Sequence, residues 1–155
     1  MSYILNLRKK IGSEPLIMVG ACVLIFNEQK QLLLQLRKDN GCWGLAGGSM
    51  DLGESLEEVA AREMVEETGL TANKLTLLHL FSGKALYYQY PHGDEVYNVV
   101  AAYTCENYSG IIQFDETEST DIKFFDVHNL PQQISPPDKI VIDYFLQQFT
   151  MKDTK

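Results

Sequence analysis

The stretch that decides the fold runs from Gly48 to Leu70 and reads GSMDLGESLEEVAAREMVEETGL. It begins inside a glycine-rich segment, residues 41–53, whose five glycines predict a loop. Residues 54–68 contain neither glycine nor proline and are rich in helix-forming residues, and Gly69 follows as a suitable helix end. We therefore predict a loop followed by a helix from Glu54 to Thr68.

The predicted helix carries three glutamates on one side. At about 100° per residue, Glu63, Glu66 and Glu67 fall within an arc of roughly 100°, on the side that also holds Leu56 and Val59. Like charges at these spacings repel, so a cation bound among them would explain the cluster, and carboxylate oxygens suit Mg²⁺, Mn²⁺ or Ca²⁺. An ordinary solvated acidic face is the alternative, and the helix alone favours it.

The complete pattern of residues around the predicted helix favours the cation site over the solvated acidic face. The pattern Gly-x5-Glu-x7-Arg-Glu-apolar-x-Glu-Glu-x-Gly-apolar is met at Gly48, Glu54, Arg62, Glu63, Met64, Glu66, Glu67, Gly69 and Leu70. Background residue frequencies make a chance match of all nine rarer than roughly one in a million. The sequence resembles the Nudix family at every defining position of its motif, the Nudix box. The resemblance is tight over residues 48–70 and looser from residue 17 to about residue 131.

The resemblance implies an α+β protein with the Nudix fold, an α/β/α sandwich around a mixed sheet, in which the box forms a loop–helix–loop motif. It also implies hydrolysis of a diphosphate bond in a nucleoside diphosphate linked to another group, with Mg²⁺ or Mn²⁺ as cofactor. The expected partner is therefore a nucleotide-linked small molecule. The identity of the linked group is not implied, because specificity resides outside the box.

The resemblance further assigns roles to individual residues. The expected metal ligands are three carboxylates and a backbone carbonyl, from Glu63, Glu66, Glu67 and Gly48. Arg62 and Glu54 are expected to hold the loop to the helix through an ion pair, with Glu54 as a further metal contact. Gly47, beside Gly48, and Tyr87 are expected at the substrate, Tyr87 because some dinucleoside polyphosphate hydrolases of the family carry a tyrosine near this position.

Other positions are less clearly assigned. Counting back from a late strand places Glu118 where the family often has a further acid that acts as base or ligand, although a solvated acidic loop explains it equally well. Tyr88, Tyr90 and Trp43 could stack on a base, but packing in the core is the more frequent role of aromatic residues in strands. The sequence departs from the common family pattern at Ala46, where proline is frequent, and at Asp51, where glutamate is frequent.

The composition limits the class of ligand and the compartment. The chain has 155 residues, with 13 basic and 21 acidic side chains, and its net charge of −8 disfavours binding to duplex nucleic acid. No apolar run is long enough to cross a membrane. The cysteines, Cys22, Cys42 and Cys105, show no metal-binding spacing and suit buried thiols in a reducing compartment. We expect one cytoplasmic domain spanning residues 1–155.

The remaining elements follow from local patterns. Apolar spacing predicts a first helix from about Ile4 to Ile11, and Pro136-Pro137 predicts the start of a final helix. Apolar and β-branched runs predict five strands, with the second as the hairpin partner of the first. They are expected at residues 17–26, 31–37, 75–81, 96–105 and 122–127.

Two functions compete with the hydrolase. One is a Nudix-fold module that senses a nucleotide without cleaving it, which usually shows loss of box acids, whereas all are present here. The other is an isomerase acting on isoprenoid diphosphates, which needs an additional catalytic cysteine and glutamate that we do not find at clear positions. A homodimer is also open: the apolar face formed by Ile4, Leu7 and Ile11 could serve one, or could cover the sheet.

Overall fold

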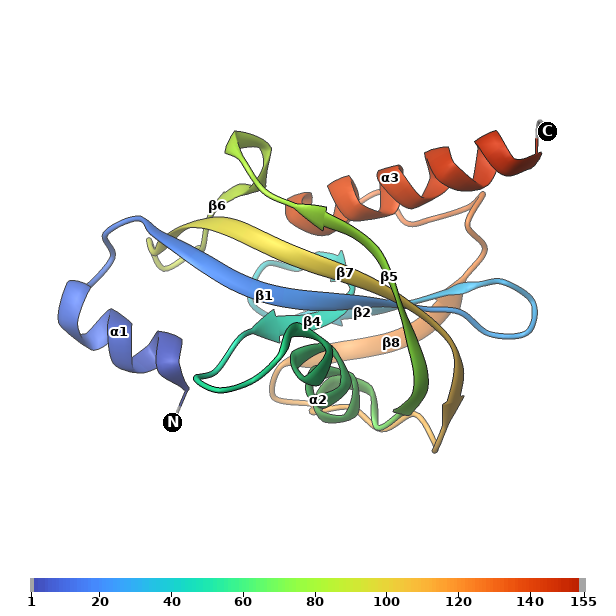
Figure 1. Ribbon diagram of the computed structural model, residues 1–155, viewed down its shortest axis with the longest axis horizontal. Coiled ribbons are helices and arrows are strands. Elements are labelled where there is room, and N and C mark those ends of the chain that lie inside the picture. The colour runs from blue at the N-terminus through green and yellow to red at the C-terminus, as the bar shows by residue number, and fades with distance from the viewer. Residues whose placement is uncertain (1, 154–155) are drawn as a thin grey trace.

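The structure is a computed structural model that describes residues 2–153 (Figure 1). The helices are α1 (Tyr3–Ile11), α2 (Leu56–Thr68), α3 (Pro136–Asp153) and a short 3-10 turn, η1 (Lys84–Leu86). The strands are β1 (Leu16–Ile25), β2 (Leu32–Arg37), β3 (Trp43–Gly44), β4 (Ala46–Ser49), β5 (Thr71–Phe81), β6 (Tyr87–Gln89), β7 (Glu95–Ser109) and β8 (Ser119–Phe125). The predicted α+β class is confirmed.

The strands form two sheets. A five-stranded mixed sheet has the order β4-β1-β7-β5, with β6 paired to β7, and its central strands β1 and β7 run parallel. A three-stranded antiparallel sheet has the order β3-β2-β8. In Figure 1, α2 lies on one side of these strands and α3 on the other, which is the α/β/α arrangement that the resemblance implies.

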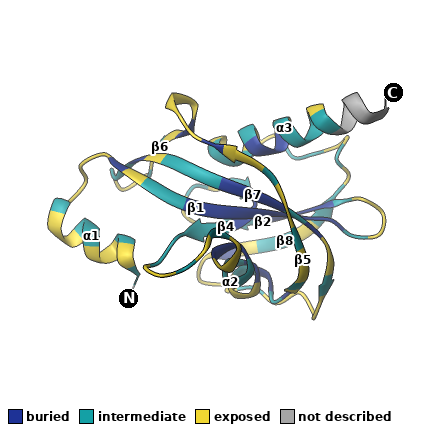
Figure 2. Ribbon diagram, viewed as in Figure 1, coloured by how far each residue is buried: buried dark blue, intermediate teal, exposed yellow. Residues whose placement is uncertain are grey.

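Strand β1 separates two hydrophobic cores. Its residues Ala21, Val23 and Ile25 belong to the core that α2 covers, whereas Cys22 and Leu24 belong to the core that α3 covers. From Ala21 to Ile25 the strand is therefore buried on both faces, and this part of β1 is dark in Figure 2. Burial on both faces explains why its sequence is an unbroken apolar run rather than an alternating one.

The predicted hairpin between β1 and β2 is wrong. Both edges of β1 are occupied, one by β7 and the other by β4, so no edge is free for β2. The two strands meet at an isolated bridge between Phe26 and Leu32 and then diverge into different sheets. The side chain of Asn27 accepts the backbone N–H of Gln31 and forms a turn. The sequence of such a turn is the same whether the two strands pair as a hairpin or diverge into different sheets.

The glycine-rich segment is not wholly a loop, because β3 and β4 lie within it. In β4, a Cβ at Gly47 would lie 2.5 Å from the carbonyl oxygen of Ala21 and 2.9 Å from Cα of Cys22. Glycine at this position therefore permits β4 to approach β1 closely. A close approach of two strands requires glycine as loops do, so a glycine-rich segment can also contain strands.

Helix α2 begins at Leu56 and not at Glu54. Ser55 has an extended backbone and its hydroxyl accepts the N–H of Glu58 at 3.1 Å, so it caps the helix. Gly69 ends the helix as predicted, with φ of 79°. A Cβ at Gly69 would also lie 2.7 Å from the carbonyl oxygen of Ile111, so substitution here would be both strained and crowded.

Helix α1 lies at one end of the molecule beside β1 and β4 (Figure 1). None of its residues is buried, but Ile4, Leu7 and Ile11 are intermediate in exposure, so its apolar face is partly covered. Among residues 2–153, no helix has the length and apolar character needed to span a membrane.

Candidate active site

Two of the box glutamates lie at the junction between α2 and β4. On the buried face of α2, Val59 and Met64 are 0% exposed and fix the helix against the core. One oxygen of Glu67 accepts the backbone N–H of Gly47 at 3.2 Å, and the other accepts the side-chain amide of Gln35. A Cβ at Gly48 would overlap the carboxylate of Glu63. Gly48 therefore leaves space for the carboxylate of Glu63.

The environment of these carboxylates disfavours two negative charges. Burial raises the pKa of Glu67 well above its ordinary value, and the neighbouring Glu63 raises it further, against the hydrogen bonds from Gln35 and Gly47. Burial likewise raises the pKa of Glu63, a shift that Arg62 partly offsets. A desolvated pair of acids needs a proton or a cation nearby, because two buried like charges cannot both be stabilised by protein alone.

Arg62 joins the box loop to the helix. Its guanidinium donates from Nε to Glu54 Oε2 at 2.7 Å and from Nη2 to Glu54 Oε1 at 2.8 Å, so the predicted ion pair is present and bidentate. It also donates to Glu63 at 2.8 Å and to the carbonyl of Ser49 at 3.2 Å. The Arg62 hydrogen bonds lower the pKa of the Glu54 carboxyl. Planar bidentate geometry is a property of arginine and not of lysine.

The third box glutamate lies apart from the other two. The side chain of Glu66 is 57% exposed and contacts Arg62 Nη1 at 3.4 Å at the rim of the site. Within residues 2–153, no three histidine, cysteine, aspartate or glutamate side chains already converge as a complete metal site. The preformed part is the pair Glu63 and Glu67, and its hard oxygen donors have the chemistry that a divalent cation such as Mg²⁺ requires.

Glu118 lies on the same open cavity as the box glutamates. This cavity has a volume of about 770 Å³ and is lined by Glu63, Glu66 and Glu67 on one side and by residues 117–119 on another. Pairing of β8 with β2 brings Glu118 there, and its carbonyl accepts the N–H of Lys38 at 2.9 Å. Glu116 is not among the residues that line this cavity. The role of Glu118 as base or ligand stays a prediction.

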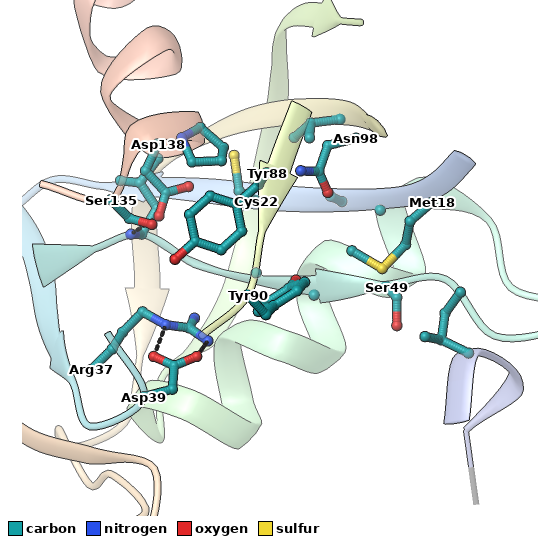
Figure 3. A pocket seen from close by; sticks show the side chains of 18 of the residues that line it. Met18, Cys22, Arg37, Asp39, Ser49, Tyr88, Tyr90, Asn98, Ser135 and Asp138 are labelled. Carbon is teal, nitrogen blue, oxygen red and sulfur yellow. Dashed lines mark hydrogen bonds and ion pairs between the residues drawn. The ribbon is translucent and has the colours of Figure 1, made fainter. Parts of the chain in front are cut away.

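A second cavity of about 310 Å³ adjoins the first (Figure 3). Residues that line both cavities make them parts of one cleft, and they are Ser2, Arg37, Asp39, Gly47, Gly48 and Ser49. Tyr88, Tyr90, Asn98 and Asp138 line the second cavity but not the first. The cleft therefore has a carboxylate-rich half and a half formed by aromatic, amide and apolar side chains.

The structure does not bring Tyr87 to either half of the cleft. Side chains alternate along β6, so Tyr87 faces the opposite way to Tyr88; its hydroxyl donates to Glu95 and its ring packs on Tyr97. Tyr88 and Tyr90 line the second cavity instead, with ring centroids 5.0 Å apart. Trp43 packs edge-on against Phe125 at the core that α3 covers, so its role is packing.

Asp138 is a cleft residue that sequence reasoning missed. It lies in the first turn of α3, where its Oδ2 accepts the N–H of Leu45 at 3.1 Å, and burial raises its pKa to about 6. A Cβ at Gly44 would lie 2.7 Å from the same oxygen. The available signal was an acid directly after Pro136-Pro137 at a helix start, which is also common in ordinary helices.

Sequence reasoning also missed three other cleft residues, Gln35, Arg37 and Asn98, because each lies within a strand and belongs to no motif.

Known proteins with similar sequences and structures show the family of this chain. A family model described as the NUDIX domain matches residues 16–145. A putative 8-oxo-dGTP diphosphatase of Bacillus subtilis is 38% identical over 127 residues, which cover 81% of this chain and 78% of that protein. An ADP-ribose pyrophosphatase of Methanocaldococcus jannaschii is 32% identical over 124 residues, which cover 77% of this chain and 69% of that protein.

Among solved structures, the MutT NUDIX hydrolase from Burkholderia pseudomallei matches with a TM-score of 0.71 at 27% identity, over 84% of this chain and 98% of that one. The chain therefore belongs to the Nudix family. Its relatives are named as a diphosphatase and a pyrophosphatase, and the chain is a Nudix-type pyrophosphohydrolase.

Proposed function

We propose that this protein hydrolyses a diphosphate bond in a nucleoside diphosphate linked to another group, with Mg²⁺ or Mn²⁺ as cofactor. The observation that carries the proposal is the desolvated pair Glu63 and Glu67, whose pKa values burial raises, facing a cleft large enough for a nucleotide. The relatives' names mention 8-oxo-dGTP and ADP-ribose, which makes these two compounds the first substrates to test.

The acidic residues of the cleft would hold the cofactor. Glu63, Glu66 and Glu67 would supply carboxylate oxygens, and Gly48 a backbone carbonyl. A bound divalent cation would neutralise charge on the diphosphate and favour ionisation of water near neutral pH. Arg62 would keep Glu63 oriented, because it binds Glu54 and Glu63 at the same time.

The other cleft residues would position the substrate. Glu118 lines the first cavity together with the box glutamates and would accept a proton from the attacking water. Gly47 would lie beside the diphosphate. Tyr88 and Tyr90 would flank the organic part of the substrate in the adjoining cavity, where aromatic faces accept any base.

Activity on a nucleotide panel tests the proposal. The protein, stripped with EDTA, is assayed by phosphate release after a coupling phosphatase, with MgCl₂, MnCl₂ or no added metal. The panel contains ADP-ribose, 8-oxo-dGTP, dinucleoside polyphosphates and nucleotide sugars. We expect turnover that depends on metal, and full activity surviving exhaustive EDTA treatment would refute the metal-dependent mechanism.

A matched pair of variants separates the box from the general acidity of the helix. Glu67→Gln is expected to lose turnover, whereas Glu57→Gln, on the exposed first turn of the same helix, is expected to keep it. Binding of a nucleotide without turnover would favour the sensing module, and turnover of an isoprenoid diphosphate would favour the isomerase.

A homodimer in solution, a single domain and a cytoplasmic location complete the proposal. Sedimentation equilibrium measures the oligomeric state.

A further inference from the structure

Helix α1 is attached to the molecule differently from the two larger helices. Helix α2 places residues such as Val59 in one core and α3 places residues such as Val141 in the other. Helix α1 has no buried residue, and Figure 2 shows its surface as exposed or intermediate. Its apolar residues are only partly covered, and polar contacts hold it near both ends.

The C-terminal end of α1 is anchored through Arg8. Its guanidinium donates to the carbonyl oxygens of Glu14 at 2.6 Å and Glu95 at 2.7 Å, and lies 3.5 Å from the carboxylate of Asp94. The Arg8 side chain is only 11% exposed. These contacts fix this end of the helix to the beginning of β7.

The N-terminal end of α1 is attached to the box loop. The backbone N–H of Tyr3 donates to Asp51 Oδ1 at 2.9 Å, and a carboxylate at a helix N-terminus also interacts favourably with the helix dipole. The backbone N–H of Asp51 in turn donates to Glu54, the ion-pair partner of Arg62. Asp51 therefore connects the first turn of α1 to the loop that carries the box.

The first turn of α1 forms part of the second cavity. Ser2, Ile4 and Leu5 line it, close to Met18, and the Leu5 residue is 57% exposed although it is apolar. Figure 3 shows the N-terminal helix entering the cavity beside Ser49, at the end opposite to Arg37. An organic group bound there would bury Leu5, which favours binding of groups with apolar surface.

We propose that the first turn of α1 is a wall that contacts the organic part of the substrate, and that Asp51 is the residue that positions this wall. The proposal rests on the proposed function, because it assumes that the diphosphate lies at the box carboxylates and the organic group in the second cavity. Losing the wall weakens substrate binding and leaves bond cleavage intact, so KM rises while kcat is retained.

Steady-state kinetics with four variants test the wall. On every panel nucleotide that the wild type hydrolyses, Asp51→Ala and Leu5→Ala should raise KM at least fivefold and keep kcat within twofold. Asp51→Asn, which retains an acceptor oxygen, should restore part of the loss. Asn6→Ala is the control, because Asn6 is exposed on the same helix and does not line this cavity. Unchanged KM in Leu5→Ala, or an equal rise in Asn6→Ala, overturns the wall.

Hydrogen–deuterium exchange tests the contact of Asp51 without requiring a substrate. Amide exchange in residues 3–7 should accelerate severalfold in Asp51→Ala while exchange in α2 stays unchanged. Unaltered exchange in residues 3–7, or a fall in kcat with unchanged KM, overturns the positioning role of Asp51. A panel without any turnover refutes the proposed function and the wall together, whereas turnover with unaffected KM refutes the wall alone.

Discussion

The two halves of the cleft are built in different ways. The carboxylate half takes Arg62, Glu63 and Glu67 from a single helix, whose period places Glu63 and Glu67 on one face, and it adds residues from β2, β4 and the segment before β8. The other half takes Leu5 from α1, and further residues from β1, the segment after β6, β7 and α3. The placement of the box side chains on α2 is therefore local, whereas the second half depends on the whole sheet. The comparison suggests that the reaction type is encoded locally and the substrate preference globally.

The halves also differ in electrostatics. In the carboxylate half, buried acids face one another and their pKa values rise, which is a local strain retained at a site of function. In the other half, polar groups have partners: Asn40 donates to the hydroxyl of Tyr88 at 3.0 Å, and Asn98 donates to the carbonyl of Leu86 at 3.0 Å. Substitutions in the first half should therefore affect catalysis, and those in the second should affect binding.

The largest effect is expected from Glu67→Gln. Removing one of the two facing charges should weaken metal binding and lower kcat by roughly 10²-fold or more, the typical loss for an electrostatic group at a reacting centre. Without metal, the melting temperature should stay the same or rise, since repulsion is relieved. Added Mg²⁺ should stabilise the wild type more than the variant. A destabilised variant with full turnover would show that Glu67 is structural.

A smaller loss is expected from Arg62→Lys. The variant keeps the charge but cannot reproduce the bidentate contact with Glu54 and the simultaneous bond to Glu63, so kcat/KM should fall by roughly tenfold or more. Combining it with Glu54→Gln in a double-mutant cycle should show strong non-additivity. Wild-type kinetics for Arg62→Lys would mean that the pair does not orient the box.

The variant Tyr90→Ala tests whether the aromatic half of the cleft binds the substrate. Tyr90→Ala should raise KM by roughly fivefold or more if the ring stacks on the substrate, with little change in kcat, and Tyr90→Phe should retain the wild-type KM. Tyr87→Ala is the matched control, since Tyr87 lies outside the cleft and should stay within twofold of the wild type. Greater sensitivity at Tyr87 than at Tyr90 would reverse our assignment of the aromatic residues.

The smallest effect concerns stability and pH. Burial raises the pKa of Asp138 to about 6, so folding favours its protonated form. Stability should therefore fall as pH rises from the unfolded value of about 4 to about 6, and Asp138→Asn should remove roughly 3 kcal/mol of that fall. Urea unfolding in EDTA at pH 4 and pH 7.5 measures it, with exposed Asp143→Asn as control. Equal pH dependence in wild type and Asp138→Asn would contradict the raised pKa.

Part of the fold was predictable because its signals are local. Gly69 ends α2 where glycine follows a helical run, and Pro136 begins α3. The start of α2 was predicted two residues too early, because Glu54 is a good helix former, while the hydroxyl of Ser55 caps the helix that begins at Leu56. The partner of β1 was not predictable, since a tight turn after Phe26 is compatible with a hairpin and with two diverging sheets.

The sequence by itself indicated the class of chemistry, because the complete nine-position pattern from Gly48 to Leu70 resembles the Nudix box, and the helix within it places Glu63 and Glu67 one turn apart. It also indicated Glu118, though only as one acid in an acidic loop. Tertiary structure alone decided that Glu66 lies at the rim, that Asp138 and Tyr90 lie in the cleft, and that Leu5 faces it. The physical reason is that these contacts depend on strand pairing between distant segments, where a shift of one residue turns a side chain to the opposite face.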